Sequence, residues 1–496
     1  MPKALTSPKF LGRLGTVSAV ALALAGCMGG GSIPSASAPI TQTEAQQGAE
    51  FHPKLLAQFG GAMQGSQAQY VESVGKNIAV QSGLGNARES FTVSLLNSPV
   101  NNAFAVPGGY IYTTRQLVTL MNNEAELAAV LGHEVGHVAA RHSQRRQQRA
   151  QRNSILGVLG AIGSSILLGG TGLEDTVSRG FLQGSQILTL RFSRSQELEA
   201  DDLGILYLTR AGYDPQAMGT VLASLAAQNQ LDAQLQGRPD ARIPEWASTH
   251  PDPASRVRRA LDAAQGLPGS VTNRDTFLSR IDGLRYGDDP AQGVIEGSQF
   301  IHPDLRLKFT APQGFYMVNS TTAVSINGQG GQAQLTLAPY SGDLQSYVRQ
   351  QFAALGGDQQ RLEPQTMERT TVNGLPAVYG QARVSNGQQQ VDVTIFAYEF
   401  SNDRAYHFAA ITPAGRSNTF ASMFQSMRRI SQAEANQVIP RRLDVVTVQR
   451  GDTIAGLARR MAYDRGQVER FRVLNALGSG DQLIAGQKVK LVVRGR

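Results

Sequence analysis

Residues 124–142 read EAELAAVLGHEVGHVAARH, and this stretch indicates the fold of the chain around it. It is rich in helix formers and contains no proline across about five turns of α-helix, and the two asparagines before it can cap its start. His133 and His137 are four residues apart, so both imidazoles project from one helix face and can reach a single cation. Glu134 follows the first histidine, where its carboxylate can act as general base on a water molecule at the metal. The alternative is a helix with two partly buried histidines that bind no metal.

A second motif downstream offers a third metal ligand. Residues 193–202 read SRSQELEADD and lead into another helical pattern. A catalytic zinc site uses three protein ligands and keeps one position open, and two histidines with one glutamate are a known set. Glu197 and Asp201 are four residues apart on one helix face, so Glu197 can bind the metal while Asp201 orients a histidine of the first helix. Alone, this acidic cluster would indicate a solvated helix face, but the first motif favours a metal site.

Together these motifs resemble a known peptidase family. HEVGH at 133–137, ELEAD at 197–201 and NAFAVPGG at 102–109 are similar to family forty-eight of the metallopeptidases, which includes the CAAX prenyl protease and bacterial HtpX. The soluble periplasmic branch of the family is the more similar one. The similarity covers about residues 50–266, and we expect the peptidase domain at 49–285.

The resemblance implies both a fold and a site. The fold is a mostly α, zincin-like domain of the gluzincin type. The site is one Zn2+ ion per chain, bound by His133, His137 and Glu197, with Glu134 as the catalytic base.

The segment NAFAVPGGYIYTT at 102–114 reads as a strand pair, or as a strand plus turn, around a Pro-Gly-Gly break that leads into the ligand helix. An edge strand beside the metal could align an extended substrate by main-chain hydrogen bonds. A core strand would have a structural role only. The sequence leaves these two interpretations open.

Two further segments bear on access to the site. Residues 248–253 read STHPDP, in which Asp-Pro can start a helix over 254–264. His250 is either incidental to this turn, or it reaches the open zinc position or a substrate oxyanion as a lid or fourth ligand. The glycine-broken apolar run at 155–173 is either a mobile loop or hairpin near the cleft, or a buried hairpin.

The N-terminus has the layout of an export signal. Three basic residues precede an apolar run at 17–24 that is too short to span a bilayer. The run ends in Leu-Ala-Gly-Cys, which resembles the lipobox of bacterial lipoproteins. We therefore expect a signal peptide at 1–26 and a lipid on Cys27, the only cysteine of the chain, followed by a flexible tether at 27–48. The alternative is a chance cysteine after a plain secretory signal.

Charge and anchor together indicate the compartment. The formal net charge of +8 comes from scattered Lys and Arg residues, so it weakly favours an anionic envelope surface, and we expect no nucleic-acid partner. Met28, in place of an aspartate after the cysteine, favours the bacterial outer membrane, with the bulk of the chain facing the periplasm.

Beyond about residue 283 the pattern changes from helical to alternating, with helical stretches at 344–355 and 417–430. We expect an α+β domain at 295–432, similar to the small sheet-and-helix domains of photosystem-associated and nuclear-transport accessory proteins. The last unit, at 443–494, resembles a LysM module of β-α-α-β form. Such modules bind glycans that contain N-acetylglucosamine, so the resemblance implies peptidoglycan as a partner. A structural or protein-docking role is the alternative.

The chain is thus expected to be multidomain. Its expected function is that of a zinc metalloendopeptidase, anchored as a lipoprotein, that degrades misassembled or unfolded envelope polypeptides in outer-membrane quality control. One alternative is an autoinhibited chaperone or cell-wall-bound scaffold with little peptidase turnover. Another is a wall-binding protein with a relic protease.

Overall fold

The computed structural model describes residues 38–145, 192–235, 250, 253–356, 362–385 and 390–495. The expected signal peptide, the lipidated Cys27 and the apolar run at 155–173 lie outside these residues. In the described part of the chain, no helix combines the length and apolar character needed to cross a membrane.

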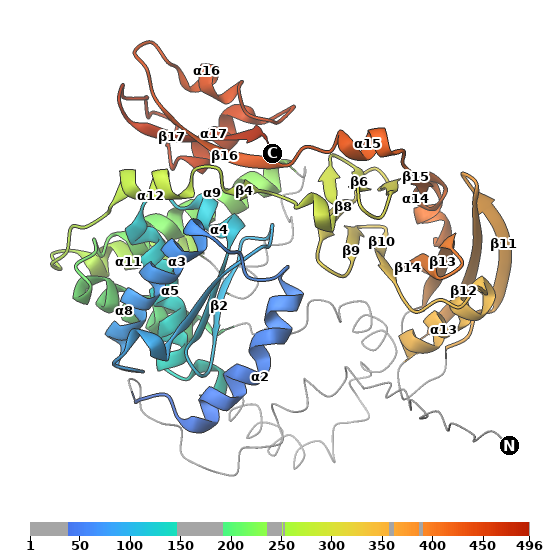
Figure 1. The fold of residues 1–496 in the computed structure, drawn as a ribbon, viewed down its shortest axis with the longest axis horizontal. Coiled ribbons are helices and arrows are strands. Elements are labelled where there is room, and N and C mark those ends of the chain that lie inside the picture. Colours follow the sequence, from blue (N-terminus) through green and yellow to red (C-terminus); the bar gives the residue numbers. More distant parts are fainter. Residues whose placement is uncertain are drawn as a thin grey trace, which may run out of the picture. The chain divides into compact units, whose positions relative to one another are not determined.

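A small sheet forms one layer of the N-terminal domain (Figure 1). Its strands β1 (Thr92–Leu96), β3 (Tyr110–Thr114) and β2 (Ala103–Val106) lie in that order, with β1 parallel and β2 antiparallel to β3. Gly108 and Gly109 turn the chain between β2 and β3 with φ of 92° and 82°, which glycine adopts without steric cost. The strand pair expected at 102–114 is confirmed. β2 is an edge strand, because among the described residues it pairs with β3 alone.

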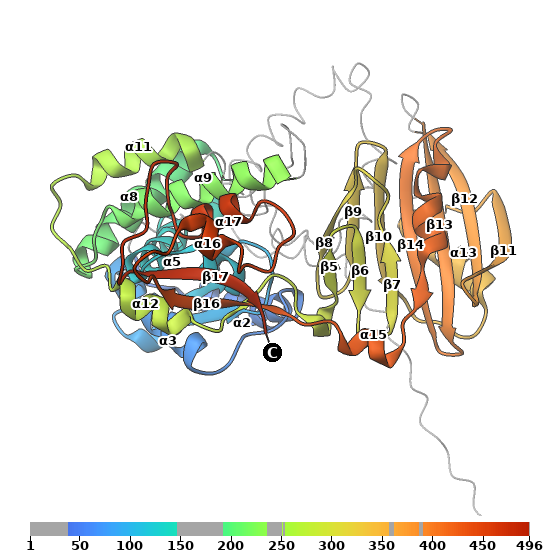
Figure 2. The same cartoon turned by 90° about the horizontal axis from the view of Figure 1, so that it is seen from above.

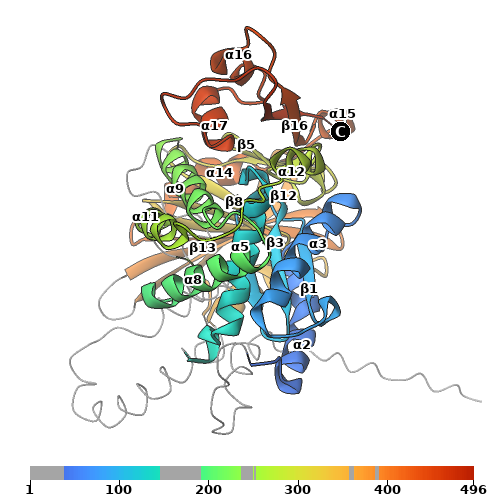
Figure 3. The same ribbon diagram turned by 90° about the vertical axis from the view of Figure 1, so that its left-hand side faces the viewer.

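Helices surround this sheet, and α5 runs through the core between them (Figure 3). Asn123 caps α5, since its side chain accepts a hydrogen bond from the Glu126 backbone N–H at 2.9 Å. Every residue of α5 except Val138 is buried. The helices of this domain are α2 (Gln42–Gln58), α3 (Ser66–Ala79), η1 (Val80–Ser82), η2 (Arg88–Ser90), α4 (Arg115–Leu120), α5 (Glu124–Ala139), α8 (Arg194–Arg210), α9 (Ala217–Leu235), α11 (Pro253–Ala264) and α12 (Arg274–Ile281).

Glycines let α5 and α8 approach closely. A Cβ on Gly136 would lie 3.1 Å from the Ala200 carbonyl oxygen, and one on Gly204 would lie 3.2 Å from the His133 backbone nitrogen. Neither position has room for a larger side chain without a shift of the neighbouring backbone. The crossing therefore brings the face of α5 that carries the histidines against the start of α8.

The flexible tether expected at 27–48 extends too far. Helix α2 begins at Gln42, because Thr41 and Glu44 form a reciprocal capping box that satisfies both backbone N–H groups at the helix start. Glu44 is itself buried and forms an ion pair with Arg141 at 3.4 Å. The first turn of α2 is thus part of the folded domain.

The middle of the chain forms an α+β region with two sheets (Figure 2). One sheet has the order β11-β12-β13-β14-β10-β9-β8, and the other has the order β15-β7-β6-β5. Helix α13 packs against β12 and β13. The elements are η4 (Pro290–Gln292), β5 (Val294–Glu296), β6 (Gln299–His302), β7 (Leu307–Thr310), β8 (Tyr316–Asn319), β9 (Val324–Gly328), β10 (Gly331–Leu337), α13 (Leu344–Gly356), β11 (Thr366–Val372), β12 (Leu375–Ser385), β13 (Gln390–Ser401), β14 (Arg404–Pro413), η5 (Ser417–Phe420), α14 (Ala421–Ser426), β15 (Arg428–Arg429) and α15 (Gln432–Asn436).

The helix expected at 417–430 ends early. It consists of η5 and α14 and stops at Ser426, because Met427 takes an extended ψ of 128°. The next two residues then pair with β7 as strand β15. The apolar pattern alone could not show this switch, since Met427, just past the end of α14, is buried in the same core as Met423 and Phe424 of that helix.

The C-terminal unit has the expected strand-helix-helix-strand order. It consists of β16 (Arg441–Thr447), α16 (Ile454–Ala458), α17 (Gln467–Leu474) and β17 (Lys488–Arg494), with β16 and β17 antiparallel. β16 also pairs with the two-residue strand β4 (Arg285–Tyr286), which follows α12.

This unit shares one hydrophobic core with the N-terminal domain. Leu443, Phe471 and Leu491 belong to the same buried cluster as residues of α3, α5 and α12. Lys490 is fully buried in this contact, and its Nζ donates hydrogen bonds to the carbonyl oxygens of Thr119, Leu120 and Met121, at the end of α4, at 2.8, 3.3 and 2.6 Å. One lysine of the C-terminal unit therefore caps the helix just before α5.

Lys490→Met should lower the free energy of unfolding by about 1–3 kcal/mol, because it leaves buried carbonyl groups without a donor. Lys488→Met is the matched control on the same strand, since Lys488 bonds Ser279 at the surface and its loss should change stability by roughly 0.5 kcal/mol or less. Urea denaturation of both variants measures the difference. Equal stabilities would show that the buried lysine does not hold the two parts together.

Candidate metal centre

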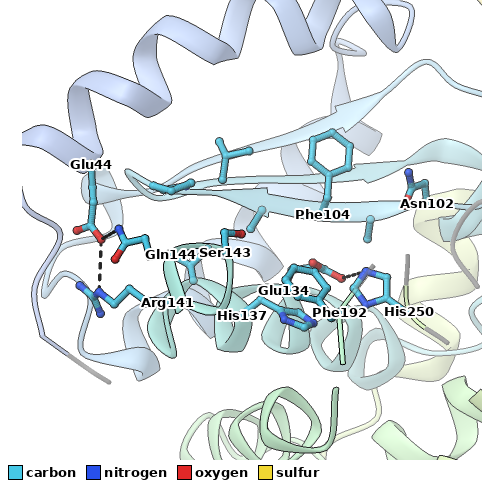
Figure 4. Close-up of a pocket in the computed structure, with 15 residues that line it drawn as sticks. Glu44, Asn102, Phe104, Glu134, His137, Arg141, Ser143, Gln144, Phe192 and His250 are labelled. Atoms are coloured by element: carbon cyan, nitrogen blue, oxygen red, sulfur yellow. Dashed lines mark hydrogen bonds and ion pairs between the residues drawn. The ribbon is translucent and has the colours of Figure 1, made fainter. Parts of the chain in front are cut away.

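Four donor atoms meet in the core where α5, α8 and residue 250 come together. His133 and His137 of α5, Glu197 of α8 and His250 each offer one ligand atom, and these atoms all lie within 4.8 Å of one another. All four side chains are buried. The structure thus brings the three expected ligands together and adds His250, whose ring lies beside Glu134 in Figure 4.

The separations between these atoms fit a single tetrahedral zinc ion. His133 Nε2 lies 3.0 Å from His137 Nε2 and 3.3 Å from His250 Nδ1. Glu197 oxygens lie 3.6 Å from the Nε2 of His133 and 3.4 Å from that of His137. Donor atoms around zinc, at bond lengths of about 2.0–2.1 Å, are separated by roughly 3.3 Å. The donor set therefore has the number, the chemical type and the spacing that zinc takes.

A buried arginine holds the carboxylates of the site in place. Arg256 of α11 donates to Glu197 Oε2 at 2.5 Å and forms a two-point contact with Asp201 at 2.8 and 2.5 Å. Asp201 Oδ1 in turn lies 2.9 Å from His133 Nδ1, on the side of the ring opposite Nε2. Asp201 thus has the geometry expected of a residue that orients the metal-facing imidazole. Arg256 was not predicted as a site residue, although the helix on which it lies was predicted from its Asp-Pro start.

A second imidazole supports His137. His142 Nδ1 lies 2.8 Å from His137 Nδ1, and His142 Nε2 lies 3.1 Å from Glu199. Phe192 stacks on the His137 ring with 3.9 Å between centroids. No role was predicted for His142, Glu199 or Phe192, although His142 lies at the end of the sequence EAELAAVLGHEVGHVAARH.

Electrostatics keep Glu197 ionised. Burial acts to raise its pKa, but the charge of His250 and hydrogen bonds with the three imidazoles outweigh burial and lower the pKa. Burial likewise acts to lower the pKa of His133, but hydrogen bonds with Asp201 and Glu197 dominate and raise it to about 9. The site thus favours positive charge at the position of the His133 proton, which a metal cation can replace.

His137 and Glu134 are perturbed in the directions that their expected roles need. Burial lowers the pKa of His137, which keeps its ring neutral and its lone pair free to bind a metal. Burial raises the pKa of Glu134, which favours acceptance of a proton by this carboxylate. Glu134 Oε1 has no hydrogen-bond partner among the described residues.

A pocket runs between Glu134 and the edge strand β2 (Figure 4). Residues 102–107 line one side of it, and Glu134, His137, Val138 and Phe192 line the other. Glu44, Arg141 and Gln144 close one end, where Gln144 donates to Glu44 at 3.1 Å. An extended chain in this pocket would meet β2, whose outer edge pairs with none of the described strands, on one side and the candidate metal ligands on the other.

Comparison with known proteins identifies this domain. Residues 65–264 match the model of peptidase family M48, and residues 446–492 match the model of the LysM domain. The chain contains an M48 metallopeptidase domain. The metal centre lies within it, on residues of the matched range.

Curated relatives share the M48 domain. The chain is 35% identical over 215 residues to the beta-barrel assembly-enhancing protease of Escherichia coli O157:H7, an alignment that covers 43% of this chain and 42% of that protein. The protein of the same name from Yersinia pestis is 35% identical over 231 residues, which cover 45% of this chain and 44% of the relative. The mitochondrial metalloendopeptidase OMA1 of Schizosaccharomyces pombe is 29% identical over 47% of this chain and 64% of its own length. This chain thus spans less than half the length of those two bacterial relatives.

Arg256→Gln should weaken zinc binding by the M48 domain by roughly 10–100-fold, because Glu197 loses a donor that orients it. The buried carboxylates also lose their counterion, which should cost about 3–5 kcal/mol of stability. Competition with a chromophoric chelator measures the affinity, and circular dichroism checks the fold.

Arg259→Gln is the matched control for this variant. Arg259 lies on the same helix but pairs with Asp202 at the surface, with its side chain 41% exposed. The zinc affinity of the Arg259→Gln variant should equal that of the unaltered protein. An Arg256→Gln variant that folds and binds zinc equally well would contradict the positioning role of Arg256.

Proposed function

We propose that the chain is a zinc-dependent endopeptidase that degrades misassembled or unfolded envelope proteins. The observation that carries this proposal is the convergence of His133, His137 and Glu197 beside buried Glu134, whose Oε1 accepts no hydrogen bond from the described residues. The pocket there is lined by β2, an edge strand in the described part of the chain. This arrangement supplies a metal, a base and a means of aligning a polypeptide.

The residues of the chain act on the peptide bond in separate roles. When bound, zinc polarises the scissile carbonyl and lowers the pKa of a water molecule. Glu134 Oε1 accepts the proton of the attacking water and returns it to the leaving amine. β2 binds the substrate main chain as an added strand, which places the scissile bond over Glu134. Val106, Val138 and Phe192 give the pocket an apolar lining, which favours an apolar substrate side chain beside the scissile bond.

His250 closes the site in the arrangement described. Its Nδ1 lies 3.1 Å from Glu197 Oε1, and its Nε2 lies 3.5 Å from Glu134 Oε1. With His250 as fourth ligand, a bound zinc ion would keep no open position for water or substrate. We infer that His250 would have to move away for hydrolysis, so that residue 250 acts as a lid.

The relatives and the sequence support a proposal for the place of action. Two bacterial relatives are named beta-barrel assembly-enhancing proteases. The lipobox-like sequence at Cys27 supports an anchor on the outer membrane, with the peptidase facing the periplasm. The LysM match supports attachment to peptidoglycan at residues 446–492. Together they support a role in outer-membrane quality control.

The closed site also favours a second candidate function. A metal with four protein ligands has a purely structural coordination, so the chain could act as an autoinhibited chaperone or wall-bound scaffold. The two functions differ in whether Glu134 is needed, because a structural metal has no use for a general base.

Glu134→Gln should therefore keep zinc and lose about 10²–10⁴-fold in turnover, since the amide cannot accept the proton. Casein hydrolysis with and without a chelator measures turnover, and metal analysis measures zinc content. Glu72→Gln, at an exposed position on α3, serves as control and should keep full activity. If Glu134→Gln protein retained its biological function, the scaffold would be favoured over the peptidase.

His250→Ala should raise the rate of casein hydrolysis several-fold while zinc stays bound by the other three ligands. The reason is that removal of the fourth ligand opens a coordination position. His302→Ala is the control, because His302 lies in the α+β region and accepts a hydrogen bond from the Leu305 backbone. A rate equal to that of the unaltered protein would count against a lid at residue 250.

A further inference from the structure

A second cleft lies where the M48 domain meets the LysM module, and we call it the seam cleft. Its volume is about 330 Å³, which is in the range of small-ligand sites. It shares no lining residue with the pocket at the metal centre. The residues that matter for its chemistry are Gly60, Asn97, Arg285, Arg441, Arg442 and Gly495.

The seam cleft is lined by three arginines and by no carboxylate. Arg285 comes from β4 of the M48 side, and Arg441 and Arg442 come from β16 of the LysM side. Figure 1 shows these two strands next to each other. Neither strand alone would bring Arg285 and Arg442 together.

Two of these arginines face each other directly. In the β4–β16 ladder, Arg442 is the register partner of Arg285. Like charges opposite each other on paired strands destabilise the pair unless something neutralises them. Asp289 forms an ion pair with Arg285 and therefore neutralises one of the two charges.

Arg441 and Arg442 form no ion pair with a carboxylate in the described part of the chain. Arg441 donates to the Ala462 carbonyl at 3.1 Å and lies over the Tyr463 ring, and Arg442 donates to the Leu443 carbonyl at 3.4 Å. Neither partner carries a charge. The ion pairs of the structure therefore leave two guanidinium charges at the cleft.

Arg115 is a further cation next to the residues that line the cleft. Arg115 is fully buried, donates to the Asn97 side chain at 2.7 Å and to the Arg285 carbonyl at 3.2 Å, and keeps its Nη2 without a hydrogen-bond partner among the described residues. The negative charges of Asp289 and Asp288 act to raise the pKa of Arg115, against the effect of burial. Burial raises the pKa of Asp288, while its charge interactions with Arg115 and Arg441 act to lower the pKa, and Asp288 does not line the cleft.

The backbone leaves room for these side chains. A Cβ on Gly495 would collide with the Arg442 guanidinium, and a Cβ on Gly60 would lie 2.5 Å from the Asn97 carbonyl oxygen. Glycine at both positions keeps the seam cleft open and lets the Arg442 side chain lie across it.

We propose that the seam cleft binds an oxyanion, a carboxylate or phosphate group of a small ligand, between Arg285 and Arg442. A guanidinium group binds both kinds of anion through two parallel hydrogen bonds, and two opposed arginines can grip one such group from both sides. The bound anion removes the repulsion across the β4–β16 pair. It thereby links the M48 domain to the LysM module, so the same ligand strengthens the seam.

Isothermal titration of the full-length protein tests this assignment with three probes. They are inorganic phosphate, a disaccharide-tetrapeptide fragment of peptidoglycan with free carboxylates, and a disaccharide of N-acetylglucosamine, which carries no carboxylate. We expect phosphate or the peptide-bearing fragment to bind, and Arg442→Gln to weaken that binding about tenfold or more. Tighter binding of the fragment than of phosphate assigns the carboxylate as the ligand group, and the reverse order assigns phosphate.

Arg494→Gln is the matched control, because Arg494 lies in the same LysM module but pairs with Glu296 and does not line the cleft. It should keep the affinity of the unaltered protein. Absence of binding by both anionic probes overturns the proposal, as does equal affinity in the Arg442→Gln variant. Binding of the uncharged disaccharide as tight as that of the fragment also overturns it, since the glycan would then carry the affinity.

Thermal unfolding separates a binding role from a structural one. Without added anion, Arg442→Gln should keep or raise the Tm, because it removes the repulsion with Arg285. With the anion present, the Tm of the unaltered protein should rise and that of the variant should not. A variant that melts earlier but binds as well as before would show that Arg442 is structural. None of these outcomes depends on peptidase activity.

Discussion

The packing around the candidate metal centre depends on how two buried carboxylates, Glu197 and Asp201, are neutralised. Removal of such charges from water is costly unless each has a partner of opposite charge and good geometry. Arg256 supplies one such partner, and the three imidazoles of the candidate metal centre lie close enough to supply others. The close crossing of α5 and α8, made by glycines, is what allows all of these groups to meet. Catalytic geometry and core stability therefore depend on the same few contacts.

The part of the site that could be predicted is the part encoded within single helices. The spacing of His133 and His137 fixes their shared face, and the second helical motif identifies Glu197 and Asp201 because a zinc site lacks a ligand without it. Arg256 could not be found in this way, because an arginine near a helix start is ordinarily exposed and only tertiary packing buries it. The pairing of His142 with His137 likewise depends on how the chain turns after α5.

The fold shows the same division. The strand pair before α5, the strand-rich middle and the LysM order follow from local patterns and were predicted from the sequence. The start of α2 was missed, although its Thr-x-x-Glu capping signature is local and readable. The early end of the helix after Ser417 was missed because strand pairing with β7 outweighs helical pattern there. Burial of Lys490 could not be foreseen, since a lysine on a strand is normally at the surface.

The common core of the LysM module and the M48 domain has a thermodynamic consequence. Segments whose apolar side chains pack in one cluster lose their stabilisation together, so they unfold as one cooperative unit. The α+β region in between has two clusters of its own. In calorimetry the N-terminal domain and the C-terminal unit would therefore melt together. The α+β region, which lies between them in the sequence, could melt separately.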